Sequence, residues 1–246
     1  MLSWQIFKHA LGMIFNDLGT ALRVSSPVIA VSLLGVLLFI VKGPAFVTGE
    51  QGVAGGVFLL AILNYIAALW VAVGWHRYCL LSEYPSKVFP EFNGSRILAY
   101  FGWALLLGLI FAGMALVLVG VVYVVGGIGT GSFSLLGGAV LTVGFIFIFW
   151  VAQRLSLILP ASAVGNTISI SESWRATQTV ATAIIMVFLF FFAFSFVLGL
   201  LAGFVGAFSG FLGFVLQAVV NWMIAMVGLS ILTTFYGICV EKRELA

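Results

Sequence analysis

The longest apolar runs limit what this chain can fold into. Residues 183–204 read AIIMVFLFFFAFSFVLGLLAGF, with no charged side chain and a single serine. A helix of about 20 such residues crosses the ~30 Å hydrocarbon core of a bilayer, where the backbone has to satisfy its own hydrogen bonds. The run also lacks the alternation of polar and apolar residues that marks a strand of a membrane β-barrel. It therefore predicts a transmembrane helix.

Composition extends this prediction to most of the chain. Of the 246 residues, 63% are hydrophobic and 7% are charged, whereas a soluble domain carries about 25% charged residues. We therefore predict an all-α polytopic membrane protein with six transmembrane helices in three hairpins. The predicted spans are 27–47, 53–75, 97–122, 133–155, 178–202 and 211–239. The predicted parts are an amphipathic interfacial segment, a six-helix bundle and a short cytoplasmic tail, at 1–26, 27–240 and 241–246.

Lysine and arginine fall almost entirely on one side of these spans. Nine of the ten lie in the N-terminal segment, the second or fourth connection, or the C-terminus: Lys8, Arg23, Arg77, Lys87, Arg96, Arg154, Arg175, Lys242 and Arg243. Lys42 alone lies in a connection of the other side. By the positive-inside rule the nine cations mark the cytoplasmic side, so we predict both termini in the cytoplasm.

Residues 3–23 are too polar to span the membrane. Apolar side chains recur at helical spacing in SWQIFKHALGMIFNDLGTALR, and Lys8, Asp17 and Arg23 occupy positions between them. This pattern predicts one amphipathic helix lying in the cytoplasmic interface. The residues SSP that follow then turn the chain into the first span, with Pro27 in its first turn.

An arginine ends the fourth span. The stretch WVAQRLSLILPAS places Arg154 directly after an apolar run, and we interpret it as an anchor that meets lipid headgroups. The residues LSLIL are expected to continue the helix along the interface until Pro160 and Gly165 break it.

Arg77 ends the second span in the same way. It follows His76 within an aromatic belt formed by Trp70, Trp75 and Tyr78. We interpret this group as interface anchors, with Arg77 reaching the headgroups. A haem or metal ligand is the alternative role for His76, but the one other histidine is His9 in the N-terminal segment.

The fourth connection leads into the fifth span through SESWRAT. The predicted residues for contact with headgroups and the interface are Arg77, Arg154, Trp174 and Arg175. At the cytoplasmic face, Arg154 and Arg175 form either a structural ion pair with Glu172 or a site for an anionic lipid headgroup. Ser171 or Ser173 is expected to cap the helix that begins here.

Three carboxamide side chains lie inside the predicted spans. Asn64 lies in the second span, and Gln217 and Asn221 lie one turn apart on one face of the sixth. They are either hydrogen-bond glue between helices or a polar stripe along a substrate path. No acidic residue lies in the middle of a span, whereas ion-coupled transporters usually keep ionisable groups inside the bundle.

Glycines recur where the fifth span runs into the sixth, at Gly199, Gly203, Gly206, Gly210 and Gly213. Gly199 and Gly203 form a small-xxx-small pair, which lets helix backbones approach closely. This approach is either packing within the bundle or a docking face for a partner subunit, and the sequence leaves both open.

One motif carries a family resemblance. It consists of Arg154, Pro160, Glu172, Ser173, Trp174 and Arg175. The motif resembles the bacterial membrane-domain family found beside glycerophosphodiester phosphodiesterases, and related uncharacterised six-span inner-membrane proteins. The resemblance covers the second half of the chain and implies a location in a bacterial inner membrane. Where members carry an enzyme, catalysis belongs to a separate soluble domain, so no catalytic residue is implied here.

No residue pattern predicts catalysis or a cofactor. The seven acidic residues are scattered, and the two cysteines at the cytoplasmic ends of spans form no metal motif. We therefore expect a non-enzymatic protein without metal, cofactor or nucleic acid, which contacts membrane lipids and a membrane-protein partner through apolar or Gly-rich faces.

Two functions are compatible with these features. The first is an accessory or assembly subunit of a membrane complex, or a bilayer-modulating protein, and it predicts no polar cavity. The alternative is a transporter or lipid-handling protein for a neutral or lipidic substrate. That function predicts a continuous central cavity lined by Asn64, Gln217 or Asn221.

Overall fold

Helices account for the regular structure in the computed structural model, which describes residues 2–43, 54–126 and 134–244. This confirms the all-α prediction. The elements are α1 (Leu2–Phe15), α2 (Leu18–Val24), α3 (Ser26–Lys42), α5 (Ala54–Leu81), α6 (Gly94–Gly126), α7 (Leu135–Leu155), α8 (Ile158–Val164), α9 (Ile170–Ala176), the 3₁₀-helix η2 (Gln178–Val180), α10 (Ala181–Phe208) and α11 (Gly210–Cys239).

Within the described residues, five stretches are long and apolar enough to cross a membrane: α5, α6, α7 with α8, η2 with α10, and α11. A sixth span is formed if α2 and α3 are taken together. Helix α3 has 17 residues, and the pair is long and apolar enough to cross a membrane, although α3 bends by 71° from α2. At the bend, the Ser25 hydroxyl donates to the Ala21 carbonyl at 2.7 Å, and Pro27 brings no N–H. The polytopic prediction is confirmed, and residues 44–47 of the first predicted span lie outside the described residues.

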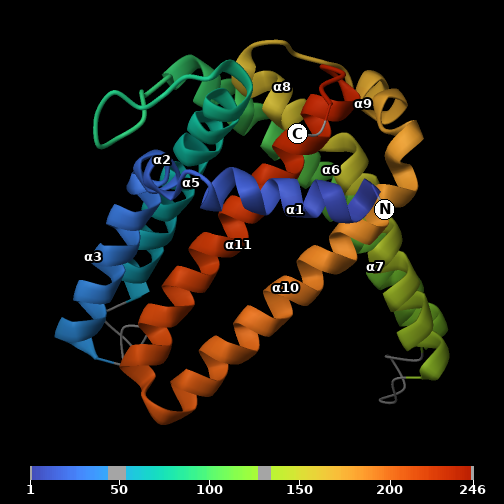
Figure 1. Cartoon of the computed structure of the whole chain (residues 1–246). Coiled ribbons are helices and arrows are strands. Elements are labelled where there is room, and N and C mark those ends of the chain that lie inside the picture. The colour runs from blue at the N-terminus through green and yellow to red at the C-terminus, as the bar shows by residue number, and fades with distance from the viewer. Residues whose placement is uncertain (1, 44–53, 127–133, 245–246) are drawn as a thin grey trace.

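The long helices pair as three antiparallel hairpins, α3 with α5, α6 with α7 and α10 with α11, as predicted (Figure 1). In Figure 1, α1, α2, α8, α9 and the end of α11 gather at the upper end of the molecule, which we call the anchor end. The end of α3 and the turn from α10 to α11 mark the opposite, tip end. The nine cations predicted on one side belong to segments of the anchor end, and Lys42 ends α3 at the tip end. Which end faces the cytoplasm stays a prediction.

Helix α8 lies in the centre of the anchor end, where protein surrounds it. The sequence did not predict this burial, and a place along the membrane interface stays a prediction. The helix packs against α5, α6 and α11, and Leu157, Ile158 and Ala161 have no exposed surface. Pro160 stands in the first turn, where its missing N–H breaks no helical bond. Gly165 alone ends the helix, in the left-handed conformation with φ +88°.

The N-terminal segment forms two helices instead of the predicted one. Asp17 interrupts it, because its carboxylate accepts from the Thr20 backbone N–H at 3.0 Å and caps α2. Helix α1 runs across α10 and α11 and buries Ile6, Ala10 and Ile14 against the bundle. Trp4 stays 52% exposed, so the helix presents apolar surface away from the bundle as well.

The glycines of α10 and α11 divide into two groups. Gly206 and Gly213 pack backbone against backbone near the turn at Ser209, where a Cβ on Gly213 would lie 2.4 Å from the Gly206 Cα. Gly199 and Gly203 meet no other group within 4 Å of a Cβ position. The close approach in the bundle is therefore made by the pair near the turn, and the small-xxx-small pair lies on an open face.

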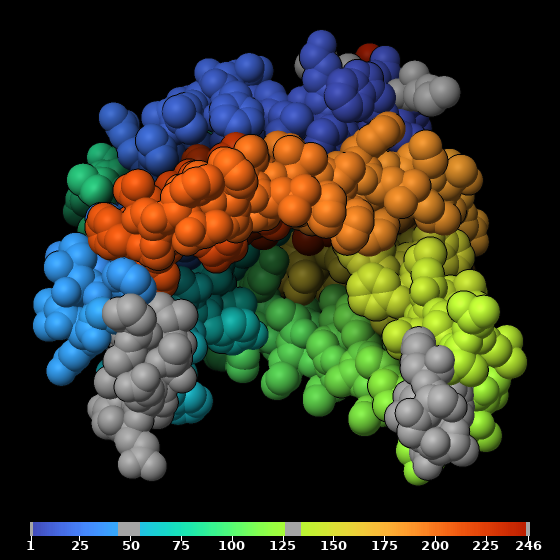
Figure 2. Space-filling model, turned by 90° about the horizontal axis from the view of Figure 1, so that it is seen from below, coloured from blue at the N-terminus to red at the C-terminus, as the bar shows by residue number. Residues whose placement is uncertain are grey.

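The molecule is hollowed at the tip end. Figure 2, seen from below, shows α10, α7, α6 and the α3–α5 hairpin around a central hollow. The hairpins therefore stand apart at their tips, while α8 fills the space between helices at the anchor end.

Cysteine labelling tests the predicted orientation. In a Cys239→Ala background, a membrane-impermeant maleimide is expected to modify the half-buried Cys79 and a Ser156→Cys variant in inside-out vesicles only. Both positions lie at the anchor end, which the positive-inside rule places in the cytoplasm. A Lys42→Cys variant without Cys79 reports on the tip end and is expected to show the opposite pattern. Modification of Cys79 from the outside of right-side-out vesicles would contradict the orientation.

Candidate functional site

The three predicted carboxamides meet at one cavity. Asn64, Gln217 and Asn221 line a cavity of about 620 Å³ between α3, α5 and α11, which we call the amide cavity. Asn64 lies about 15 Å along α5 and Asn221 about 16 Å along α11, at 1.5 Å per residue. Both helices start at the tip end (Figure 1), and α5 has 28 residues and α11 has 30, so each amide lies about one third of the way along its helix from the tip end.

The described lining of the amide cavity is neutral. Most of these residues are aliphatic or aromatic, and within the described residues none of them is Asp, Glu, Lys, Arg or His. Gln217 Nε2 donates to Asn221 Oδ1 at 2.8 Å within α11. The sequence interpretation missed four further polar residues of the lining: Ser25, Ser32, Tyr100 and Trp222. Ser25 was visible only as part of a turn, and Tyr100 and Trp222 as aromatic residues in apolar runs.

Arg154 is buried, with 4% of its surface exposed. Its guanidinium lies between two indole rings, with Cζ 4.9 Å from the Trp150 centroid and 3.5 Å from the Trp174 centroid. Nε donates to Thr177 Oγ1 at 3.0 Å and Nη2 to the Trp174 carbonyl at 2.6 Å. The cation is therefore stabilised by π faces and by two oxygens at the C-terminal end of α9.

The ion pair of Arg154 and Arg175 with Glu172 does not form within the described residues, where the salt bridges join other groups. Glu172 and Ser169 instead form a capping box at the start of α9, so Ser169 is the cap in place of Ser171 or Ser173. The Ser173 hydroxyl donates to the Arg154 carbonyl at 2.7 Å. A contact of Arg154, Trp174 or Arg175 with lipid headgroups stays a prediction.

Arg77 also has protein partners. Nη2 and Nε donate to the Glu83 carboxylate at 2.5 Å and 2.7 Å, and Nη1 donates to the Ala163 carbonyl at 3.1 Å. Arg77 therefore ties the end of α5 to α8. These bonds do not test the predicted contact of Arg77 with lipid headgroups.

The interface role predicted for His76 and Trp75 is wrong. Both side chains have no exposed surface, because they face α11 inside the bundle. Trp75 Nε1 donates to Ser230 Oγ at 3.0 Å, and His76 Nδ1 lies 2.8 Å from Thr233 Oγ1. An ionisable side chain is thus present inside the bundle, where the sequence interpretation placed none.

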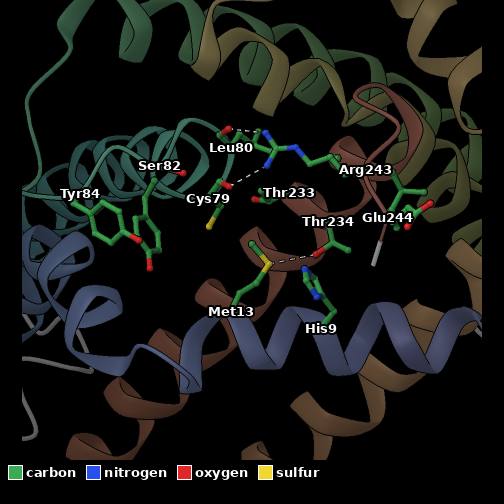
Figure 3. A pocket seen from close by; sticks show the side chains of 13 residues that line it. His9, Met13, Cys79, Leu80, Ser82, Tyr84, Thr233, Thr234, Arg243 and Glu244 are labelled. Carbon is green, nitrogen blue, oxygen red and sulfur yellow. Dashed lines mark hydrogen bonds between the residues drawn. The ribbon is translucent and has the colours of Figure 1, made fainter. Parts of the chain in front are cut away.

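A second cavity of about 370 Å³ opens at the anchor end, and we call it the surface cavity. Figure 3 shows that α1, α5, α11 and the C-terminal tail contribute to it. Thr234 Oγ1 lies 3.4 Å from Met13 Sδ, and Arg243 Nη2 donates to the Leu80 carbonyl at 2.6 Å. His9 and Cys79 also line it, yet no group of three or more His, Cys, Asp or Glu suited to a metal ion occurs in the part of the chain that the structure describes.

Comparisons with known proteins add no relative. No family model matches the chain, and neither a curated protein nor a solved structure matches it. The resemblance to the membrane domain beside glycerophosphodiester phosphodiesterases therefore stays a prediction.

The Arg154 site is expected to stabilise the fold through its planar guanidinium. Arg154→Lys keeps the charge but loses the stacking and one of two hydrogen bonds. Hydrogen bonds of charged groups contribute about 1.5–3 kcal/mol, so the unfolding midpoint should fall by roughly 5 °C or more. Thermal unfolding of the purified protein in detergent measures this. Arg175→Lys changes an exposed arginine and is the control; equal midpoints for Arg154→Lys and wild type would contradict the prediction.

The capping box of α9 makes stability depend on pH. The Ser169 backbone N–H donates to Glu172 at 2.6 Å, and this bond holds the pKa of the carboxyl below its usual 4.5. A lowered pKa contributes stability above the usual pKa, which is lost as the pH falls through the lowered value. Glu172→Gln keeps a capping amide and cannot titrate. Wild type should therefore be the more stable protein at about pH 7, and the difference should vanish in acid; a difference independent of pH would contradict this.

Proposed function

We propose that the protein is a non-enzymatic lipid-handling or transport protein, which holds a neutral amphipathic molecule in the amide cavity. One observation carries the proposal: three carboxamides from α5 and α11 line a single cavity. A transporter or lipid-handling protein is expected to have a cavity lined by these amides, whereas an accessory subunit is expected to have no polar cavity.

The hydrogen bonds of the amides support a ligand over a role as glue between helices. The bond from Gln217 to Asn221 lies within α11, and Asn64 has no hydrogen-bond partner among the described residues. In that part of the chain, α5 and α11 are instead joined by the bonds of Trp75 and His76. The amide groups are therefore available to a ligand.

The lining also limits the chemistry of the ligand. A volume of about 620 Å³ lies within the range of ~300–1,000 Å³ that is usual for ligand pockets. A charged group would enter without a counter-charge, at a high desolvation cost. A neutral headgroup that bonds to amides, followed by an acyl chain along the aliphatic wall, meets neither obstacle. We further propose that the ligand enters the amide cavity from a bacterial inner membrane, and that the anchor end of the protein faces the cytoplasm.

The accessory function retains one supporting feature. Gly199 and Gly203 present a smooth strip of α10 with open space beside it, and small residues let a partner helix approach closely. A membrane-protein partner at this strip stays a prediction.

Lipid binding by the purified protein tests the proposal. We expect 1-monooleoylglycerol to be retained by wild type in native mass spectrometry from detergent, and oleate to bind more weakly because of its charge. The double variant Asn64→Leu/Asn221→Leu should lower the affinity about tenfold, since a neutral hydrogen bond is worth about 0.5–1.5 kcal/mol.

Two single variants guard against misfolding of the double variant. Ala68→Phe fills the cavity from an exposed lining position and should abolish retention. Leu116→Phe changes a 73% exposed side chain of α6 away from the cavity and should leave retention unchanged. Equal retention by wild type, Ala68→Phe and Leu116→Phe would refute the proposed binding site.

A further inference from the structure

A polar wall separates the amide cavity from the surface cavity. On α5, the lining of the amide cavity ends at Ala72 and that of the surface cavity begins at Tyr78. On α11, the two linings meet at Leu232 and Thr233. His76 therefore lies between the cavities, joined to Thr233 across the wall at 2.8 Å.

The contacts of His76 indicate which tautomer it adopts. The Thr233 hydroxyl donates its proton to the Leu229 carbonyl at 2.7 Å, so it accepts from Nδ1–H of the imidazole. Nε2 of the neutral ring then carries a lone pair and no proton. This atom is buried and has no hydrogen-bond partner among the described residues.

Tyr100 covers the imidazole on the side of the amide cavity. It lines that cavity, is 5% exposed, and its ring centroid lies 5.8 Å from that of His76. A rotation of the Tyr100 side chain is therefore the movement that brings Nε2 into contact with the amide cavity.

Packing alone does not account for a histidine at this position. An unpaired buried acceptor costs about 1–3 kcal/mol, and buried polar groups are rarely left without a partner. Phenylalanine has a similar shape and avoids that cost. A molecule that brings an O–H or N–H donor to Nε2 supplies the missing bond.

We infer that His76 Nε2 accepts a hydrogen bond from the headgroup of the molecule held in the amide cavity. The ligand class is then a neutral amphiphile with a hydroxyl or N–H donor. This inference rests on the proposed function of the amide cavity.

Two lipids with the same chain test the inference. 1-Monooleoylglycerol carries hydroxyl donors, and methyl oleate carries none. Wild type in detergent should prefer the first by about tenfold or more, because its hydroxyls donate to the amide oxygens and to Nε2, whereas methyl oleate has no donor. In His76→Phe this preference should fall, while the affinity for methyl oleate stays the same. If His76→Phe keeps the lipid preference of wild type, the inference is overturned. This holds also if the variant unfolds at a higher temperature, because the histidine would then only have cost stability.

A second pair of variants serves if His76→Phe does not fold. Tyr100→Ala removes the ring that covers Nε2 and should increase the preference for 1-monooleoylglycerol. Tyr100→Phe keeps the ring and should preserve the preference of wild type. Equal preferences in Tyr100→Ala and Tyr100→Phe overturn the inference. Failure of wild type to bind either lipid would instead overturn the proposed function.

Discussion

The fold depends on the burial of α8 between α5, α6 and α11. This short helix has almost no exposed surface at its centre, and it contacts one helix of each of the three hairpins. It lies at the anchor end only, so the hairpins are joined there and stand apart at their tips (Figure 2). The arginines reinforce the same end, since Arg77 binds α8 and Arg154 joins α7 to α9. The position of α8 thus leaves room for the amide cavity nearer the tips.

Sequence reasoning predicted the spans well because their signal is local. Apolar content and the one-sided cations are properties of consecutive residues, and they located the three hairpins. The place of α8 was not predictable in this way. The residues LSLIL are equally suited to a membrane interface and to a protein interior, and hydropathy does not distinguish the two. Only the three helices that surround it decide that it is buried.

The charged residues show the same limit. Arg154 is visible in the sequence as a cation after an apolar run, but Trp150, Trp174 and Thr177 are recognisable as its partners only once α9 has folded back. His76 was placed at the interface because its neighbours are aromatic. Its burial depends on the rotation of α5 about its axis, which turns it towards Thr233 on a helix more than 150 residues away.

The amide residues were partly predictable. An amide in an apolar run is conspicuous, and Gln217 and Asn221 share a face because of helical spacing alone. That Asn64 faces the same cavity depends on the parallel arrangement of α5 and α11, which belong to different hairpins. Nothing in the sequence distinguishes Tyr100, because tyrosines are common in apolar helices. Its position beside the His76 ring is recognisable only in the folded structure.

The central hollow makes the two ends of the molecule unequal. The helices pack closely around α8 at the anchor end and stand apart around the hollow at the tip end (Figure 2). Under the proposed function, lipid that enters the hollow would come from the leaflet at the tips, while the anchor end would displace lipid of the other leaflet. The area that the protein occupies would then differ between the two leaflets.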